Sequence, residues 1–157
     1  MFTMSGTHIL DTLLALSGVL GADQERELDR RGLTPARTHI LWLVFHEGPR
    51  TQAELATALG VTPRNITTLV DGLEATGFAR REPHPHDRRA VLVTLTPRGE
   101  QAMRAMDAEH TELGAQLIDG LDHATAEATL RGLTHVLDRL NGLIAEHEAR
   151  TAEDGPA

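Results

Sequence analysis

The segment QAELATALGVTPRNITTLVDGLEATGFARREPHPHDRRAVLVTL, residues 52–95, contains two short helical patterns followed by two strand patterns. The first helical pattern stops at Gly60, and the second begins at Thr62 and Pro63 and stops at Gly77. Thr62 suits the N-cap position, and Pro63 suits the first helical position because the N–H that proline lacks has no partner there. The second pattern has apolar residues at i, i+3, i+4 and i+7, which form one buried face: Ile66, Leu69, Val70 and Leu73. Two helices joined by a tight turn that contains glycine are a helix-turn-helix.

The polar side of the second helix predicts contacts with DNA. In a helix-turn-helix the N-terminal residues of this helix reach base edges, where Arg pairs with guanine, Asn with adenine, and Thr uses its hydroxyl or methyl group. We expect base contacts from the polar residues of its first two turns: Arg64, Asn65, Thr67 and Thr68. Gln52 and Thr62, near the starts of the two helices, are expected to bind backbone phosphate. A solvated polar face is the alternative interpretation of such a helix taken alone.

Two strand patterns follow the helices and predict a β-hairpin. Residues 90–95 are rich in β-branched and aliphatic side chains, and residues 78–82 are their expected partner. Pro83 and Pro85 cannot occupy the interior of a ladder, so we place both in the connecting loop. A helix-turn-helix followed directly by a hairpin with a basic tip is a winged helix. The predicted fold class is therefore mainly α with a small β-hairpin wing.

Three motifs in this region carry a family resemblance. They are the turn Leu55-Ala56…Leu59-Gly60-Val61-Thr62, the signature Asp87-Arg88-Arg89 and the closure Leu95-Thr96-Pro97-Arg98-Gly99. With these motifs in this order, residues 33–100 resemble the MarR family of transcriptional regulators. The resemblance implies a sequence-specific binder of double-stranded DNA that acts as a homodimer, with repression as the expected role. It implies no catalytic residue and no cofactor.

The resemblance also implies roles for the charged residues of the wing. Arg88 and Arg89 lie at or just beyond the predicted tip, where a narrow minor groove attracts arginine. Asp87 is acidic beside DNA, so the resemblance implies that it pairs with a neighbouring arginine and stiffens the wing. Arg81 matches a basic position in the family's first wing strand, and both a DNA contact and a structural role stay open for it.

Apolar helical patterns flank the winged helix (about residues 33–100) on both sides, at about residues 6–30 and 97–148. The last pattern has a narrow seam at alternating spacings of three and four: Leu130, Leu133, Leu137, Leu140 and Ile144. We expect these helices to form a homodimer. It would set the second helix of each helix-turn-helix, the recognition helix, about 10 bp from its counterpart on a near-palindromic operator. A monomeric helical core is the alternative. The chain is expected to be a single domain, residues 1–157, with a disordered tail from about residue 150.

Charge is distributed unevenly along the chain. The net charge is −8, yet residues 50–99 contain seven Arg and five acidic residues, which leaves eight Arg and eighteen acidic residues elsewhere. The basic excess therefore lies where phosphates are expected. Salt screens this positive charge from the acidic charge of the flanking helices, so the two regions act nearly independently.

The absence of cysteine excludes disulfides and thiolate zinc sites. Without a signal-peptide pattern or an apolar run of ~20 residues, a cytoplasmic location and no membrane partner are expected.

The resemblance further implies a small aromatic or phenolic effector that releases the DNA. The candidate lining residues are aromatic, apolar or imidazole side chains: His39, Trp42, Leu43, His46, Met106 and His110. Trp and Met offer adaptable apolar contacts, and His offers a polar group that responds to pH. The same residues can instead be core and interface side chains, which leaves a DNA-binding dimer without ligand response. A sensory metal site at His39 and His110 lacks a third ligand.

The run His84-Pro85-His86-Asp87 offers an alternative of another class. Imidazole and carboxylate groups can hold zinc, so a metal-dependent hydrolase would use His84, His86 and Asp87. A catalytic metal site needs three ligands in fixed geometry and an open position. The proline-bearing loop and the adjacent Arg88 and Arg89 oppose a bound cation. We therefore expect no metal site and no enzyme activity.

Overall fold

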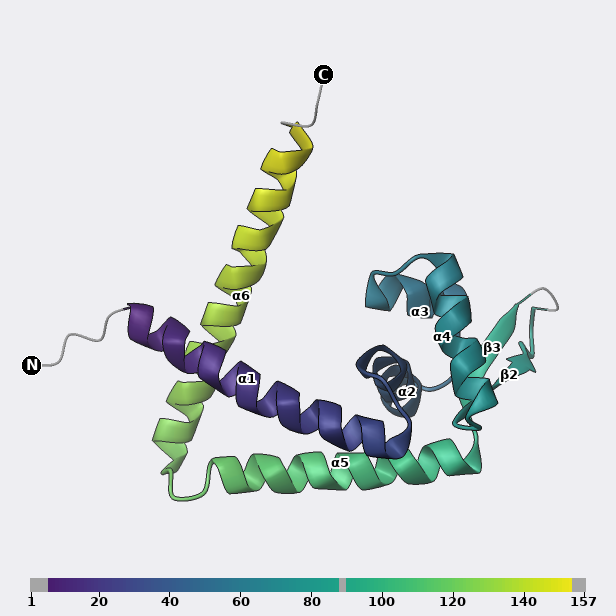
Figure 1. The fold of residues 1–157 in the computed structure, drawn as a ribbon, viewed down its shortest axis with the longest axis horizontal. Helices are drawn as coiled ribbons and strands as arrows, with labels where there is room; N and C mark the ends of the chain where they lie inside the picture. The colour runs from purple at the N-terminus through teal and green to yellow at the C-terminus, as the bar shows by residue number, and fades with distance from the viewer. Residues whose placement is uncertain (1–5, 88–89, 154–157) are drawn as a thin grey trace, which may run out of the picture. The chain divides into compact units, whose positions relative to one another are not determined.

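The computed structural model describes residues 6–87 and 90–153 (Figure 1). The chain folds as two compact units, one ending at Asp107 and the other starting at Ala108. Helix α5 (Pro97–Leu117) begins in the first unit and ends in the second, and α6 (His123–Glu153) lies in the second. The other elements belong to the first unit: α1 (Gly6–Arg31), α2 (Pro35–Glu47), β1 (Arg50–Thr51), α3 (Gln52–Leu59), α4 (Pro63–Ala75), β2 (Ala79–Pro83) and β3 (Val91–Leu95).

Threonine caps fix the starts of the two helices of the helix-turn-helix. Thr51 and Glu54 form a capping box at α3, in which the Thr51 hydroxyl accepts the Glu54 N–H at 3.3 Å and the Glu54 carboxylate accepts the Thr51 N–H at 2.8 Å. The Thr62 hydroxyl accepts the Asn65 N–H at 3.3 Å and caps α4 as predicted. Between the two helices, Gly60 has a φ of 64°, a left-handed conformation that favours glycine. The predicted helix-turn-helix is therefore confirmed.

The buried apolar residues of the first unit form one cluster, to which α2, α3, α4 and the sheet all contribute: Leu28, Leu33, Ile40, Leu41, Val44, Leu55, Ala56, Ile66, Val70, Leu73, Phe78, Ala79, Val93 and Met103. Three of the four residues predicted for the buried face of α4 belong to this core, and Leu69 packs at its edge. Burial of this face holds α4 in place by the hydrophobic effect. The opposite face of α4 is left for solvent or a partner.

The wing is part of a three-stranded antiparallel sheet with the order β1-β3-β2. The predicted hairpin is confirmed, but Pro83 is not in its loop, because it forms the last residue of β2 opposite Val91. Proline is tolerated there since it lies at the end of an edge strand and need not donate to the ladder. The sequence did not predict β1, which places Arg50 opposite Val93. A strand of two residues is too short to show alternation.

The start of α5 is fixed against the end of α4. The Thr96 N–H donates to the Phe78 carbonyl at 3.1 Å, and the Thr96 hydroxyl accepts the Gly99 N–H at 3.1 Å, so Thr96 caps α5. Arg98 Nη1 donates to the Thr76 carbonyl at 2.8 Å, and its guanidinium lies over the Phe78 ring, 4.6 Å from the centroid. A Cβ at Gly99 would overlap the Phe78 carbonyl oxygen. Glycine therefore permits this close approach of α5.

The second unit consists of the end of α5 and α6, whose apolar side chains are largely exposed within the chain. The predicted seam of α6 is 45–67% exposed: Leu130, Leu133, Leu137, Leu140 and Ile144. Helix α6 continues past its predicted end near residue 148, so the first residues of the predicted disordered tail are helical. Residues 154–157 of that tail lie outside the described residues. Among the described residues, no helix combines the length and hydropathy needed to cross a membrane.

Candidate nucleic-acid interface

The exposed face of α4 presents the four residues predicted to contact bases. Arg64, Asn65, Thr67 and Thr68 are all exposed, while Ile66 between them is buried. This alternation follows from the helical period, which turns Ile66 into the core and its neighbours outward. The four side chains occupy the first two turns after the Thr62 cap. The arrangement can place donors and methyl groups in a major groove, which is wide enough for a helix.

The start of α3 lies next to this face. The Thr67 hydroxyl is 3.1 Å from Gln52 Oε1 and 2.9 Å from the Pro63 carbonyl oxygen, within hydrogen-bond distance of both. The structure therefore brings together Gln52, predicted to bind phosphate, and Thr67, predicted to contact a base. The Thr68 hydroxyl donates to the Arg64 carbonyl at 3.2 Å.

Arg81 is held by two carboxylates of α4. Its Nη2 lies 2.7 Å from Asp71 Oδ1, its Nη1 bonds to Glu74 Oε2, and its backbone N–H donates to Glu74 Oε1 at 2.7 Å. Partial burial alone would lower the pKa of Arg81, but the hydrogen bonds to Asp71 and Glu74 outweigh burial and raise it. The guanidinium therefore connects β2 to α4.

The wing tip is organised by the ring of His84. Its Nδ1 accepts the backbone N–H groups of His86 at 3.2 Å and Asp87 at 3.0 Å, so this nitrogen is not available to a metal ion. In the described ranges 6–87 and 90–153, no group of three His, Cys, Asp or Glu residues has a geometry for metal binding. Arg88 and Arg89 lie outside the described residues, and the predicted pairing of Asp87 with a neighbouring arginine stays a prediction.

The predicted effector residues are only partly brought together. The rings of Trp42 and His46 are stacked, with centroids 4.8 Å apart and planes 4° apart, and His46 Nε2 lies 3.8 Å from Asp107 Oδ1. Leu43 and Met106 pack against the core, whereas His39 is exposed. His110 belongs to the second compact unit. Trp42 and His46 therefore form an aromatic pair, and the other residues stay candidates.

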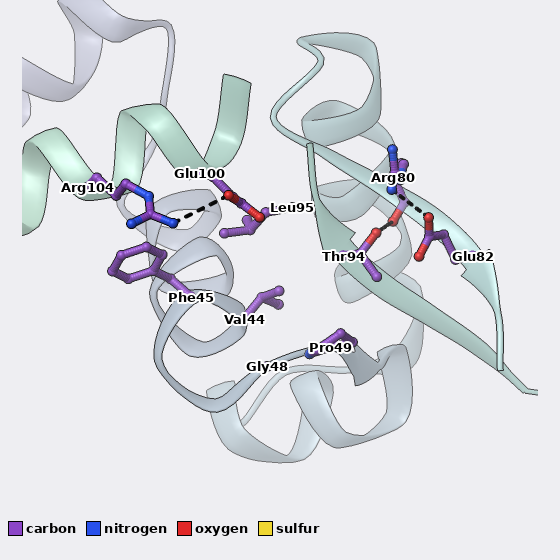
Figure 2. A pocket seen from close by; sticks show the side chains of 10 residues that line it. All are labelled: Val44, Phe45, Gly48, Pro49, Arg80, Glu82, Thr94, Leu95, Glu100 and Arg104. Atoms are coloured by element: carbon purple, nitrogen blue, oxygen red, sulfur yellow. Dashed lines mark hydrogen bonds and ion pairs between the residues drawn. The ribbon is translucent and has the colours of Figure 1, made fainter. Parts of the chain in front are cut away.

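A pocket that the sequence did not predict lies between the end of α2, the sheet and the start of α5 (Figure 2). Its volume is about 410 Å³, within the range of small-molecule sites. Its lining combines apolar groups with two ion pairs: Val44, Phe45, Gly48, Pro49, Arg80, Glu82, Thr94, Leu95, Glu100 and Arg104. None of the predicted effector residues lines it. No sequence signal could have found it, because its walls come from segments that are distant in the chain.

A helix-turn-helix with an exposed polar second helix and a hairpin wing defines the chain as a winged helix-turn-helix protein. The sequence profile of the MarR family matches residues 33–91. The transcriptional regulator PA3341, known from a crystal structure, is 31% identical, with a TM-score of 0.62 over 85% of this chain and 98% of PA3341. The chain thus belongs to the MarR family.

Two other comparisons describe the extent of the likeness. The uncharacterized HTH-type transcriptional regulator YkoM of Bacillus subtilis (strain 168) is 29% identical over 96 residues, which are 61% of this chain and 62% of YkoM. The matched part therefore spans less than two thirds of that relative. Streptococcus pneumoniae FabT, solved in complex with DNA, has the same fold, with a TM-score of 0.78 at 24% identity over 88% of this chain and 99% of FabT.

Proposed function

We propose that this protein is a transcriptional regulator that binds a specific double-stranded DNA sequence as a homodimer, with α4 in the major groove. The exposed face of α4 carries the proposal, because its opposite face is anchored in the core and fixes its position. Within residues 6–87 and 90–153, the Arg64 guanidinium has no carboxylate or hydrogen-bond acceptor. Its charge and its donors are therefore available to guanine or phosphate.

The wing extends the proposed contact into the minor groove. Arg88 and Arg89 would supply the cations there, since narrow minor grooves attract arginine. Gln52 and Thr62 would bind phosphates on either side of the recognition helix. Arg81 supports this arrangement by joining β2 to α4 through Asp71 and Glu74, and we assign it this structural role.

The proposed regulation is repression that a small aromatic or phenolic effector relieves. Phe45 lines the pocket of Figure 2 and lies edge-on to Trp42, with centroids 6.4 Å apart. A ligand in contact with this aromatic group would touch α2 and both strands of the wing. It would release DNA if its affinity for the DNA-incompetent arrangement of the protein were higher than its affinity for the DNA-competent arrangement. A cytoplasmic location fits this role.

The test is selection of binding sites from a pool of random-sequence duplexes, followed by fluorescence anisotropy with the selected duplex. The wild-type protein is expected to enrich a near-palindromic site. Arg64→Ala is expected to weaken binding to it by about 1–3 kcal/mol and to relax the preference at one base pair of each half-site. The cause is the loss of bidentate hydrogen bonds to a base edge.

Arg150→Ala is the matched control, because Arg150 is an exposed arginine in the last turn of α6 that donates to the Glu146 carbonyl at 3.2 Å. This variant is expected to bind like the wild type. Failure of the wild-type protein to enrich any sequence, or equal effects of the two substitutions, would contradict the proposed function.

A further inference from the structure

Among the arginines that the structure describes, Arg37 belongs to the few without a hydrogen-bond or ion-pair partner in the described part of the chain. In residues 6–87 and 90–153, every arginine except Arg37 and Arg64 pairs with a carboxylate or donates to a backbone carbonyl. Arg64 is exposed on the recognition helix, whereas Arg37 of α2 is half-buried. A half-buried cation loses hydration and gains no ion pair in return, which is unfavourable unless an anion is bound.

The guanidinium of Arg37 lies directly on α4 at Gly72. A Cβ at position 72 would overlap Arg37 Nη2, Cζ and Nε, so the guanidinium occupies the space into which a side chain at this position would project. A residue of α2 therefore takes the place of a side chain on the recognition helix.

Position 72 belongs to the side of α4 that carries the predicted base contacts. Gly72 follows Thr68 by four residues and Asn65 by seven, and residues at these spacings lie on one side of a helix. Thr68 and Asn65 are both exposed. Arg37 therefore adds a positive charge to the same edge, about two turns further along the helix.

Within the described residues, no carboxylate forms an ion pair with Arg37. The two carboxylates of α4, Asp71 and Glu74, are both held by Arg81. Arg37 also lies in the first turn of α2, which starts at the Thr34 cap and has no acidic residue in that turn. The positive end of the helix dipole opposes a cation there and favours a bound anion.

We propose that Arg37 is a further DNA contact, which binds a backbone phosphate beside the groove that α4 enters and reaches it across Gly72. The inference rests on the proposed DNA-binding function and deepens it. It assigns a phosphate contact to α2, an element for which only effector residues were predicted. Gly72 serves this contact by leaving space for the guanidinium.

The experiment measures the affinity of the full-length protein for the selected duplex and for an unrelated duplex by fluorescence anisotropy at several NaCl concentrations. Each phosphate contact contributes about −0.9 to the slope of log K against log salt concentration. Arg37→Gln is expected to make this slope shallower by about one on both duplexes, with about tenfold weaker binding near physiological salt. A structural role for Arg37 would leave the slope unchanged.

Two variants complete the design. Arg150→Gln removes an exposed arginine in the last turn of α6 that donates to the Glu146 carbonyl at 3.2 Å, and it is expected to keep the wild-type slope. Gly72→Ala keeps the charge of Arg37 but displaces its guanidinium, so it is expected to weaken binding in the same direction as Arg37→Gln. Alanine is a better helix former than glycine. Weaker binding together with an equal or higher melting temperature therefore cannot result from unfolding.

An unchanged slope for Arg37→Gln on a duplex that the wild type binds would overturn the inference while leaving the proposed function intact. Absence of any wild-type binding would overturn both. Free phosphate is distinguished by replacing chloride with inorganic phosphate at constant ionic strength. If phosphate raised the melting temperature of the wild type but not of Arg37→Gln, and the slope stayed the same, the site would serve a free anion and the DNA assignment would be wrong.

Discussion

At the scale of single residues, the surroundings of a guanidinium decide its role. Arg81 and Arg37 both lie against α4, but Arg81 binds the two carboxylates of this helix and Arg37 binds none within the described ranges. The charge of Arg81 is neutralised by these carboxylates, and its side chain fixes β2 against α4. The charge of Arg37 is not compensated by any carboxylate of the described residues.

Arg81→Gln is expected to destabilise the wing, because it leaves Asp71 and Glu74 without their cation. Hydrogen bonds to charged groups contribute about 1.5–3 kcal/mol each, so a loss of about 1–3 kcal/mol in the free energy of unfolding is expected from this partly exposed site. Urea unfolding followed by circular dichroism measures it.

Arg80→Gln is the matched control, since Arg80 is the adjacent residue and its pair with Glu82 is largely exposed. It is expected to change stability by less than about 0.5 kcal/mol. If Arg81→Gln instead kept full stability and lowered the salt slope of DNA binding, Arg81 would be a DNA contact and not a structural residue.

The sequence predicted the residues of the candidate site whose position follows from a helical period. Arg64, Asn65, Thr67 and Thr68 follow from the cap at Thr62 and the apolar face of α4. The contact of Arg37 with Gly72 could not be predicted, because it joins two helices through a side-chain conformation. The same holds for the pocket of Figure 2.

At the scale of elements, strong periodicity and capping residues explain which parts of the fold the sequence revealed. Helix α4 begins at its threonine and proline signals and ends just before glycine, and the bounds of α1 and α4 agree closely with prediction. Strand β1 and the last turns of α6 were missed because neither carries an apolar pattern. In the last turns of α6, local hydrogen bonds such as that of the Thr151 hydroxyl to the His147 carbonyl at 3.0 Å accompany the helix.

The capping box of α3 predicts a specific pH dependence of stability. Hydrogen bonds from the backbone and the hydroxyl of Thr51 lower the pKa of Glu54 below its ordinary value of 4.5. A carboxylate whose pKa is lower in the folded state stabilises the fold above its unfolded pKa, and this contribution is lost as the pH falls through the folded pKa. The contribution of Glu54 is therefore present above pH 4.5 and lost below it.

Glu54→Gln removes this titration. The wild type is expected to be more stable than the variant at roughly pH 6, and the difference is expected to be smaller at roughly pH 3, because the carboxylate takes up a proton as the pH falls through its lowered folded-state pKa. Urea unfolding at both pH values measures the difference. Glu25→Gln, which alters an exposed residue of α1, is expected to show no such dependence. A difference that stays constant with pH would contradict the role of the Glu54 charge.

At the scale of the whole molecule, the exposed apolar seam of α6 predicts self-association. Exposed large apolar patches on a protein commonly mark interaction surfaces, and a repeat of three and four residues suits the packing of one helix on another. A second copy of this chain is the proposed partner, since a two-fold dimer would give each half of a near-palindromic site its own recognition helix.

Leu137→Glu is expected to convert the dimer to monomer, because it places a charge in the centre of the seam, where Leu137 is 57% exposed in the single chain. Sedimentation velocity measures the mass, and DNA affinity is expected to fall with it. His135→Glu introduces the same side chain on the opposite face of α6 and is expected to stay dimeric. A wild-type protein that sediments as a monomer would remove the dimer from the proposal.

Helix α5 is one continuous helix that begins beside the end of α4 and ends in the second unit. Its first turn is clamped to the end of α4 by Thr96 and Arg98 and by the tight fit of Gly99 against Phe78. The helix then runs unbroken for 21 residues, about 30 Å, into the second unit. In a stiff rod of this length, a pivot of roughly 5° at one end moves the other by roughly 3 Å, which is a large displacement compared with the tolerance of a hydrogen bond to a base. Under the proposed function, a molecule that bends or rotates the far half of α5 would therefore act on the exposed face of α4 through a lever and need not touch that face.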